Sequence, residues 1–343
     1  MADDKPPLWT GDQVEGWTVE RVIARGGMAW VYHVSHPDRG EAALKVLDPR
    51  LVSEGSKQRR WLVFARFKRE GRIQSRLRHE NIVAVYDTMD VDGTPALLME
   101  LVDGPALDEV LEQRDLSIAE IDAIADGIFA GIRAAHEEGV LHRDLKPSNI
   151  LLDTSGDTPV AKVADFGIAK DQASDLEPAD ELPTELTRTG QVMGTPSYMA
   201  PRQAADSKHV DEIVDCFALG ILFHELCTRR RIADEGKFVE APAVENAVRA
   251  LRKERRLPRR MVRAIEASLS DDPPFDSASG MAEIWRTGRI PRRPGVRGLV
   301  LAAVALVVAA AVVGWGGQVD FNALARLPDW VSLEGIRQAS FPP

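Results

Sequence analysis

Apolar and polar positions alternate along the N-terminal part of the chain, as they do in strands that bury one face. Five strands are expected there, at residues 17–23, 30–34, 42–47, 82–86 and 95–99. The first two are joined across Gly26 and Gly27, which is a turn signal. Residues 61–77 instead show the period of an amphipathic helix. The pattern therefore predicts a small, mainly β unit that contains one helix.

From Ala106 onward the apolar period becomes helical. Helices are expected at residues 107–113, 118–138, 212–227, 244–253, 259–269 and 279–286. The stretch 171–190 is rich in Ser, Thr, Asp, Glu and Pro and has no apolar period, so we expect a loop there. A larger helical unit is thus predicted to follow the β unit.

Length and charge limit the classes of function. A chain of 343 residues holds one large or two ordinary domains. The net charge of −10 argues against nucleic acid as a partner. The only cysteines, Cys216 and Cys227, lie in one predicted helix and are separated by about 16 Å at the helical rise. A disulfide between them is excluded on that geometry, and two reduced core cysteines are expected.

A membrane-spanning helix is predicted at residues 298–317, which contain no charged residue. Twenty helical residues span about 30 Å, the thickness of the hydrocarbon core of a bilayer. The alternative is a buried core helix, but such helices rarely lack a polar face over five turns. No apolar signal-peptide core is present at residues 1–12.

The charges on either side of this span predict its orientation. Arginines precede it at positions 286, 289, 292, 293 and 297, whereas the first charge after it is Asp320. The positive-inside rule then places the N-terminal bulk of the chain in the cytoplasm and the C-terminus outside the cell membrane, in a single pass. Small residues four apart, Ala305 with Ala309 and Ala310 with Gly314, allow a homodimer through the span.

The chemistry concentrates in the string His-Arg-Asp-Leu-Lys-Pro-Ser-Asn at 142–149, which is followed by Asp165-Phe166-Gly167. A carboxylate, an amine and a carboxamide lie close together, and a second carboxylate comes later. Phosphoryl transfer needs an aimed acceptor hydroxyl and metal-bound phosphates held in line. The string resembles the catalytic loop and metal-binding motif of protein kinases, and of the Ser/Thr type because Lys146 follows Asp144 by two residues.

This resemblance, to the eukaryotic-like transmembrane Ser/Thr protein kinases of bacteria, implies an α+β, two-lobed fold with a small antiparallel β lobe. It divides the chain into a polar tail (1–16), an N-lobe (17–102), a C-lobe (103–288), a basic juxtamembrane linker (289–297), the span (298–317) and a short outer tail (318–343). The implied cofactors are ATP and Mg²⁺, and the implied partners are protein substrates and the membrane.

The resemblance also assigns catalytic roles. Asp144 accepts the proton of the substrate hydroxyl, Lys146 meets the γ-phosphate, and Asn149 and Asp165 hold Mg²⁺. Lys45 pairs with the α and β phosphates and with Glu70 of the 61–77 helix. The hydroxyl of Thr195 bridges Asp144 and Lys146.

The nucleotide site is placed by the same resemblance. The phosphate-covering hairpin holds Ile23, Ala24, Gly26, Gly27, Ala29 and Val31. The gatekeeper is Met99, and Glu100 and Val102 offer backbone groups to adenine, while Val31, Ala43 and Leu151 sandwich the ring. Ala24 and Ala29 stand where the family pattern has glycine. Because glycine lets the backbone approach phosphate, weaker ATP binding is expected.

Activation and docking involve the segment after Asp165. Thr187 and Thr189 align with the paired threonines of bacterial activation segments and are the candidate autophosphorylation sites. The family's Ala-Pro-Glu reads Ala200-Pro201-Arg202 here, and its distant Arg partner is replaced by Asp276. Since the two changes restore opposite signs, a reversed Arg202–Asp276 salt bridge is predicted.

Two other functions compete with a membrane-anchored Ser/Thr kinase. A pseudokinase scaffold that binds nucleotide or a partner without turnover is favoured by Ala24, Ala29 and Arg202. A small-molecule kinase is disfavoured by residues 194–199, which resemble the peptide-docking segment of protein kinases. All of the residues that touch the chemistry are present, so an active protein kinase is the leading hypothesis.

Overall fold

The structure, a computed structural model, describes residues 5–50, 57–166, 196–200, 211–234 and 236–291. Contacts divide the chain into two units, 1–291 and 292–343, and the described residues all belong to the first. The predicted span and outer tail therefore lie outside the described residues. Among the helices that are described, none combines the length and the apolar character needed to cross a bilayer.

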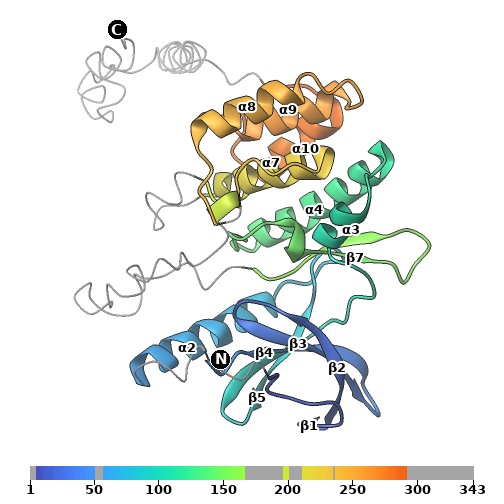
Figure 1. Cartoon of the computed structure of the whole chain (residues 1–343), viewed down its shortest axis with the longest axis vertical. Coiled ribbons are helices and arrows are strands. Elements are labelled where there is room, and N and C mark those ends of the chain that lie inside the picture. The colour runs from blue at the N-terminus through green and yellow to red at the C-terminus, as the bar shows by residue number, and fades with distance from the viewer. Residues whose placement is uncertain (1–4, 51–56, 167–195, 201–210, 235, 292–343) are drawn as a thin grey trace, which may run out of the picture. The chain divides into compact units, whose positions relative to one another are not determined.

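The small lobe is built around a six-stranded antiparallel sheet with the order β1-β2-β3-β4-β6-β5. Its strands are β1 (Gln13–Val14), β2 (Trp17–Arg25), β3 (Ala29–His36), β4 (Gly40–Leu47), β5 (Val85–Val91) and β6 (Thr94–Met99). Helix α2 (Lys57–Gln74) lies along this sheet, as Figure 1 shows.

Strand β4 shows how the alternating pattern divides the small-lobe core. Ala42, Leu44 and Val46 face one cluster, which also holds residues of β2 and β3. Ala43 and Leu47 face another cluster together with Phe67 of α2. Because side chains two apart share a face, Lys45 lies on the same side of the sheet as Ala43, toward the larger lobe.

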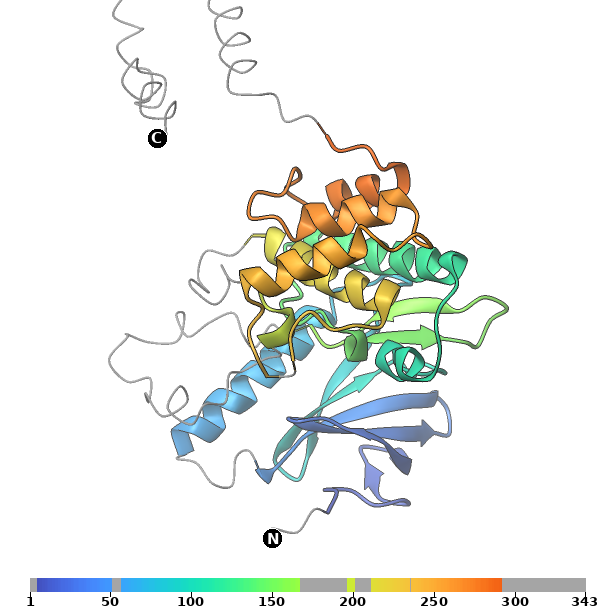
Figure 2. The ribbon, with the colours of Figure 1, turned by 45° about the horizontal axis from the view of Figure 1, so that its top comes forward.

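The large lobe is mainly helical and buries one continuous core. Its elements are α3 (Leu107–Gln113), α4 (Ile118–Glu137), the 3₁₀ turn η1 (Pro147–Asn149), β7 (Ile150–Asp153), β8 (Val160–Val163), the 3₁₀ turn η3 (Pro196–Tyr198), α7 (Ile213–Thr228), α8 (Ala241–Leu251), α9 (Arg259–Ser268) and α10 (Ala278–Thr287). Figures 1 and 2 agree that α8, α9 and α10 form the end of this lobe farthest from the sheet.

Helix α4 begins at a capping box, which the sequence carries as Ser117 and Glu120. The amide of Glu120 donates to Ser117 Oγ at 3.2 Å, and the amide of Ser117 donates to Glu120 Oε2 at 2.9 Å. The guanidinium of Arg114 also contacts Glu120, at 2.7 Å. Hydrogen bonds from Arg114 and Ser117 lower the pKa of Glu120 to about 2. The capping box therefore fixes the start of α4 directly after Ser117.

The two-lobed α+β fold agrees with the expectation, but several elements differ from it in detail. The fourth expected strand, 82–86, is wrong in its bounds: β5 begins at Val85, and Ile82 makes an isolated bridge to Val163 instead. Helix α2 begins and ends earlier than 61–77. Strands β1, β7 and β8 were not expected, because two to four residues are too short for a period to be recognised. Both cysteines are buried and free on α7.

Candidate active site

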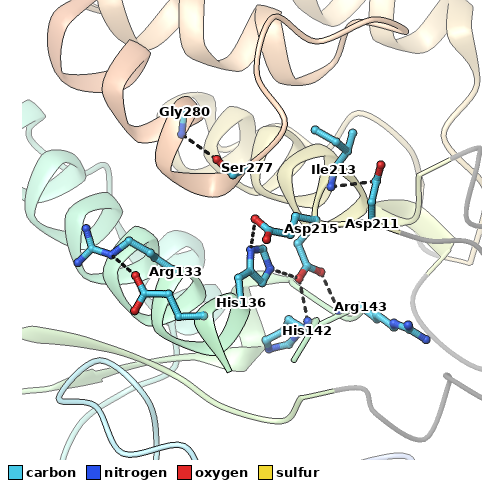
Figure 3. A network of polar contacts seen from close by, with 11 residues as sticks. Arg133, His136, His142, Arg143, Asp211, Ile213, Asp215, Ser277 and Gly280 are labelled. Carbon is cyan, nitrogen blue, oxygen red and sulfur yellow. Dashed lines mark hydrogen bonds and ion pairs between the residues drawn. The ribbon is translucent and has the colours of Figure 1, made fainter. Parts of the chain in front are cut away.

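The string 142–149 forms a loop between α4 and β7, and a buried carboxylate on α7 fixes its start. Asp215 is fully buried. The backbone amides of His142 and Arg143 donate to its two oxygens, each at 2.8 Å (Figure 3). Arg143 has a φ of +61°, a conformation that costs energy for a residue other than glycine. The hydrogen bonds to Asp215 supply the constraint that holds this strained turn.

A histidine of α4 stands between Asp215 and a second carboxylate. His136 Nε2 lies 2.8 Å from Asp215 Oδ2, and His136 Nδ1 lies 3.0 Å from Glu212 Oε2. Carboxylate oxygens only accept, so the ring can donate to both carboxylates only as an imidazolium. Burial alone lowers the pKa of His136, but the bonds and charges of Asp215 and Glu212 outweigh burial, and the pKa is raised.

The ring of His142 links the loop to the segment that carries Asp165. The amide of Asp144 donates to His142 Nδ1 at 3.2 Å, and His142 Nε2 lies 3.0 Å from the carbonyl oxygen of Ala164. An amide only donates and a carbonyl only accepts, so the ring proton sits on Nε2. The ring also contacts the buried ring of Phe166, with centroids 4.6 Å apart. The two motifs of the sequence are thus held together through one side chain.

The hairpin of β7 and β8 brings the two expected metal ligands together. Ile150 pairs with Val163 in this hairpin, and the amide of Ala164 donates to the carbonyl oxygen of Asn149 at 2.8 Å. Asp165 is the next residue along the chain. The Asn149 side-chain nitrogen donates to the backbone oxygen of Asp144 at 2.8 Å, which leaves its amide oxygen for another partner. A carboxamide and a carboxylate oxygen are the hard donors that Mg²⁺ prefers, so this pair fits the ion.

Lys45 crosses from the sheet to this hairpin. Its Nζ lies 2.7 Å from Asp165 Oδ1. Burial by itself lowers the pKa of Lys45, but the charges of Asp165 and then Glu70 raise it above the ordinary value. Burial likewise acts to raise the pKa of Asp165, but Lys45 holds it below the ordinary value. The contact described for Lys45 is therefore with Asp165, while the expected partner Glu70 lies near enough for its charge to act on the amine.

Asp144 and Lys146 lie side by side within the loop 142–149. Lys146 Nζ is 3.5 Å from Asp144 Oδ2. A cavity of about 140 Å³ opens next to Lys146 and is also lined by Tyr198 and Arg231. Beneath it Tyr198 donates to Glu225, and Arg231 Nε is 3.2 Å from Glu225 Oε1. The cavity provides room for an acceptor beside the two catalytic candidates.

The expected adenine-contacting side chains lie in one apolar cluster. Ala43 and Met99 are buried in it, and Val31, Val102 and Leu151 pack against it half-buried. The lining therefore comes from β3, β4, β6, the hinge and β7, which are far apart in the sequence. Because Val31, Val102 and Leu151 are only half-buried, they leave an apolar surface for a flat ring to contact.

The hinge residue Glu100 is held in place by three contacts. Its amide donates to the carbonyl oxygen of Ala84 at 2.8 Å, and its side chain accepts from the amide of Ala84 at 3.1 Å. Glu100 Oε1 also lies 2.8 Å from Lys162 Nζ. Because its amide is already used, Glu100 can present only its backbone oxygen to adenine.

The hairpin that is expected to cover the phosphates has its turn at Gly26 and Gly27. The Gly26 amide donates to the carbonyl oxygen of Ala29 at 2.8 Å. Ile23 and Ala24 are exposed on β2, and Ala29 is buried at the start of β3. A Cβ added at Gly27 would meet no atom within 4 Å.

Four residues named from the sequence lie outside the described residues, namely Thr187, Thr189, Thr195 and Arg202. Their roles stay predictions. The other member of the predicted bridge, Asp276, is described and exposed. Burial raises the pKa of the Cys216 thiol most, and the charges of nearby carboxylates, with Asp276 among them, raise it further. Asp276 is therefore close to the start of α7.

Sequence reasoning missed Asp215, His136 and Glu212. An available signal was Asp215 itself, which is an acidic residue inside the apolar run 213–223 of α7. A carboxylate in a fully buried helix needs a partner, and such a residue marks a buried polar network.

Comparison with known proteins identifies the class. Residues 17–272 match the protein kinase domain family, and the chain belongs to that family. It is 33% identical to Serine/threonine-protein kinase pkn3 of Myxococcus xanthus, covering 90% of this chain and 60% of that protein. It is 34% identical to Serine/threonine-protein kinase PknL of Mycobacterium tuberculosis, covering 66% of this chain and 53% of that protein.

Solved structures agree on the fold. The PknI kinase domain of Mycobacterium tuberculosis superposes with a TM-score of 0.61 at 28% identity, covering 82% of this chain and 100% of that one. The apo form of PpkA-294 gives a TM-score of 0.65 at 20% identity, covering 81% of this chain and 99% of that one, which supports the fold alone. The resemblance stated from the sequence, to bacterial Ser/Thr protein kinases, is confirmed.

Proposed function

We propose that this chain is a membrane-anchored Ser/Thr protein kinase that transfers the γ-phosphate of ATP to hydroxyl groups of protein substrates. The observation that carries the proposal is the convergence of Lys45, Asp144, Asn149 and Asp165. They come from β4, the catalytic loop, η1 and the segment after β8, and direct contacts join Lys45 to Asp165 and Asn149 to Asp144.

The residues divide the chemistry among them. Asp144 stands beside the cavity next to Lys146, where it can accept the proton of an incoming Ser or Thr hydroxyl. Lys146 would hold the transferred phosphate, and Lys45 would hold the phosphates that remain on the nucleotide. Asn149 and Asp165 would hold Mg²⁺, which when bound neutralises negative charge that develops on the phosphates.

Membrane anchoring through 298–317, with the kinase domain in the cytoplasm, belongs to the same proposal. It is supported by the uncharged run and by the arginines that precede it. Activation by phosphorylation of Thr187 and Thr189 is proposed as well, because a phosphate there could pair with Arg143 beside Asp144. Phosphopeptide mass spectrometry of the active chain should find phosphate on one or both threonines.

A nucleotide-binding scaffold without turnover is the rival, and Ala24 and Ala29 are the observations that favour it. The deciding experiment compares phosphate incorporation from labelled ATP by the full chain and by the Asp144→Asn variant. The variant keeps the size of the side chain and should lose nearly all transfer, by about 10²–10⁴-fold for a positioned base. Equal, background-level incorporation by both proteins would end the kinase proposal.

A further inference from the structure

The end of α8 and the start of α9 carry a charge opposite to that of the chain. Residues 249–263 include eight Lys and Arg residues and one Glu, whereas the whole chain has a net charge of −10. We call the eight basic residues the α8–α9 basic surface: Arg249, Arg252, Lys253, Arg255, Arg256, Arg259, Arg260 and Arg263. Such a local reversal of sign attracts an anionic partner.

Most of this surface is open to solvent, and only part of it is neutralised within the domain. All eight side chains except the half-buried Arg260 are exposed. The internal ion pairs are Arg252 with Glu266, Arg256 with Asp115 and Arg260 with Asp122. Among the described residues, no ion pair forms for Arg249, Lys253, Arg255 or Arg259. At least four cations are therefore available to an outside partner.

The surface lies where the chain leaves the domain. Arg263 Nη1 donates to the carbonyl oxygen of Gly288 at 2.8 Å, and Arg260 Nη1 donates to that of Trp285 at 3.0 Å. Gly288 ends α10, the last described helix. Figure 2 shows α8, α9 and the end of α10 at the same end of the lobe. The apolar run begins at Gly298, ten residues after Gly288, and ten extended residues reach at most about 35 Å.

We propose that the α8–α9 basic surface docks on anionic phospholipid headgroups of the cytoplasmic leaflet. The inference rests on the proposed membrane anchoring, because a short tether keeps the surface near the bilayer at all times. A free polyanion lacks this advantage and is repelled by the rest of the acidic chain. Each exposed Lys or Arg near an anionic membrane strengthens binding about fivefold.

Docking by this end would also set the position of the catalytic residues. The sheet lobe lies away from α8 and α9 in both views (Figures 1 and 2). The cavity beside Lys146 would stay open to protein substrates while the domain is held at a fixed height above the membrane. Anionic lipid would thus act as a partner of the anchored kinase.

The test uses the full chain in lipid nanodiscs with a fluorophore on Ala250→Cys, an exposed position within the surface. The native cysteines are buried and burial raises the pKa of both thiols, so the new thiol reacts selectively. A headgroup quencher reports docking. We expect quenching in discs that contain phosphatidylglycerol, little in pure phosphatidylcholine, and loss of quenching in about 0.5 M salt.

The variant Arg255→Gln/Arg259→Gln should lower the docked-to-undocked ratio about 25-fold, since two fivefold contributions are removed. The matched control is Arg21→Gln/Arg76→Gln, which removes the same charge from exposed positions elsewhere and should leave quenching unchanged. Equal quenching in both lipids, or an unaffected double variant, would overturn the inference, as would binding to polyglutamate without any response to anionic lipid.

Failure of the anchoring itself is recognised separately, because the chain would then be absent from discs of pure phosphatidylcholine. In that case flotation of the same chain with phosphatidylglycerol vesicles decides the matter. Flotation that the Arg255→Gln/Arg259→Gln variant loses would support the surface, and no flotation would overturn it.

Discussion

Replacing Glu212 by Gln should lower stability most at mildly acidic pH and should move the alkaline decline of catalysis to lower pH. Glu212 faces one nitrogen of the His136 ring, and Asp215, which fixes the catalytic loop, faces the other. With Glu212 neutral, the imidazolium loses one of its two counter-charges. The ring then gives up its proton at lower pH, and a neutral imidazole has one N–H for two acceptors.

The size of the expected stability loss follows from the exposed fractions of the two side chains. The His136 side chain is 4% exposed, but that of Glu212 is 38% exposed. A shielded hydrogen bond between charged groups contributes about 1.5–3 kcal/mol, and solvent screening reduces this one to about 1 kcal/mol. That free energy corresponds to a shift in Tm of roughly 2–4 °C for a domain of this size.

The pH dependence has a definite sign. The folded pKa of His136 is raised, so its contribution to stability is complete below the unfolded value of 6.5 and is lost as the pH rises through the folded pKa. The difference in Tm between wild type and Glu212→Gln should therefore be largest near pH 6 and should shrink toward pH 9. The kcat of the variant should decline at lower pH than that of the wild type, because the catalytic loop shares Asp215.

Neighbouring groups supply the control. Arg133 and Glu137 lie on the same helix as His136, and their side chains are 3.8 Å apart. Both line a second cavity together with His136 and Glu212. Glu137→Gln removes the same charge from a side chain that is 71% exposed, so its effect should be small and independent of pH. A constant Tm difference for Glu212→Gln from pH 6 to 9, or the same profile for Glu137→Gln, would refute the reasoning.

Three further outcomes are expected. Gly131→Ala should destabilise the fold by about 1–3 kcal/mol in thermal unfolding, because the added Cβ would lie 2.5 Å from a backbone oxygen, whereas Gly156→Ala, which meets nothing within 4 Å, should not. The lowered pKa of Glu120 predicts a small stability contribution from its capping box that is present above about pH 4.5 and is lost in acid melts as the pH falls toward about 2. Arg202→Glu and Asp276→Arg should each reduce Tm and activity, and the double variant should recover much of the loss; additive damage would refute the bridge.

The sequence was sufficient to predict the helices and strands whose apolar pattern runs over many residues. The sheet lobe, α3, α4 and the helices from α7 to α10 follow from apolar periods that run over several turns or pairs. The hairpin of β7 and β8 could not be found this way, because four-residue strands contain too few alternations. That hairpin is nevertheless what places Asn149 beside Asp165.

The roles of the site residues could be predicted from the sequence more readily than the side chains that they contact. Motif spacing pointed to Lys45, Asp144, Asn149 and Asp165, and the structure joins Lys45 to Asp165. Contacts of this kind depend on rotamers and burial, which a linear pattern does not contain. The network around Asp215 depends on contacts between residues more than seventy positions apart, and no local pattern encodes such contacts.

The backbone also changes how the two alanines in the phosphate hairpin should be judged. Glycine is required where φ is positive or where a backbone must come close to another group. Ala24 pairs with Val31 in the sheet, and Ala29 pairs with Leu47. Neither alanine is among the described residues with positive φ. A methyl group is ordinary in such strand positions, and the turn itself keeps Gly26 and the unobstructed Gly27. The departures that favoured a scaffold therefore lie where a side chain is tolerated, and their position supports an active kinase.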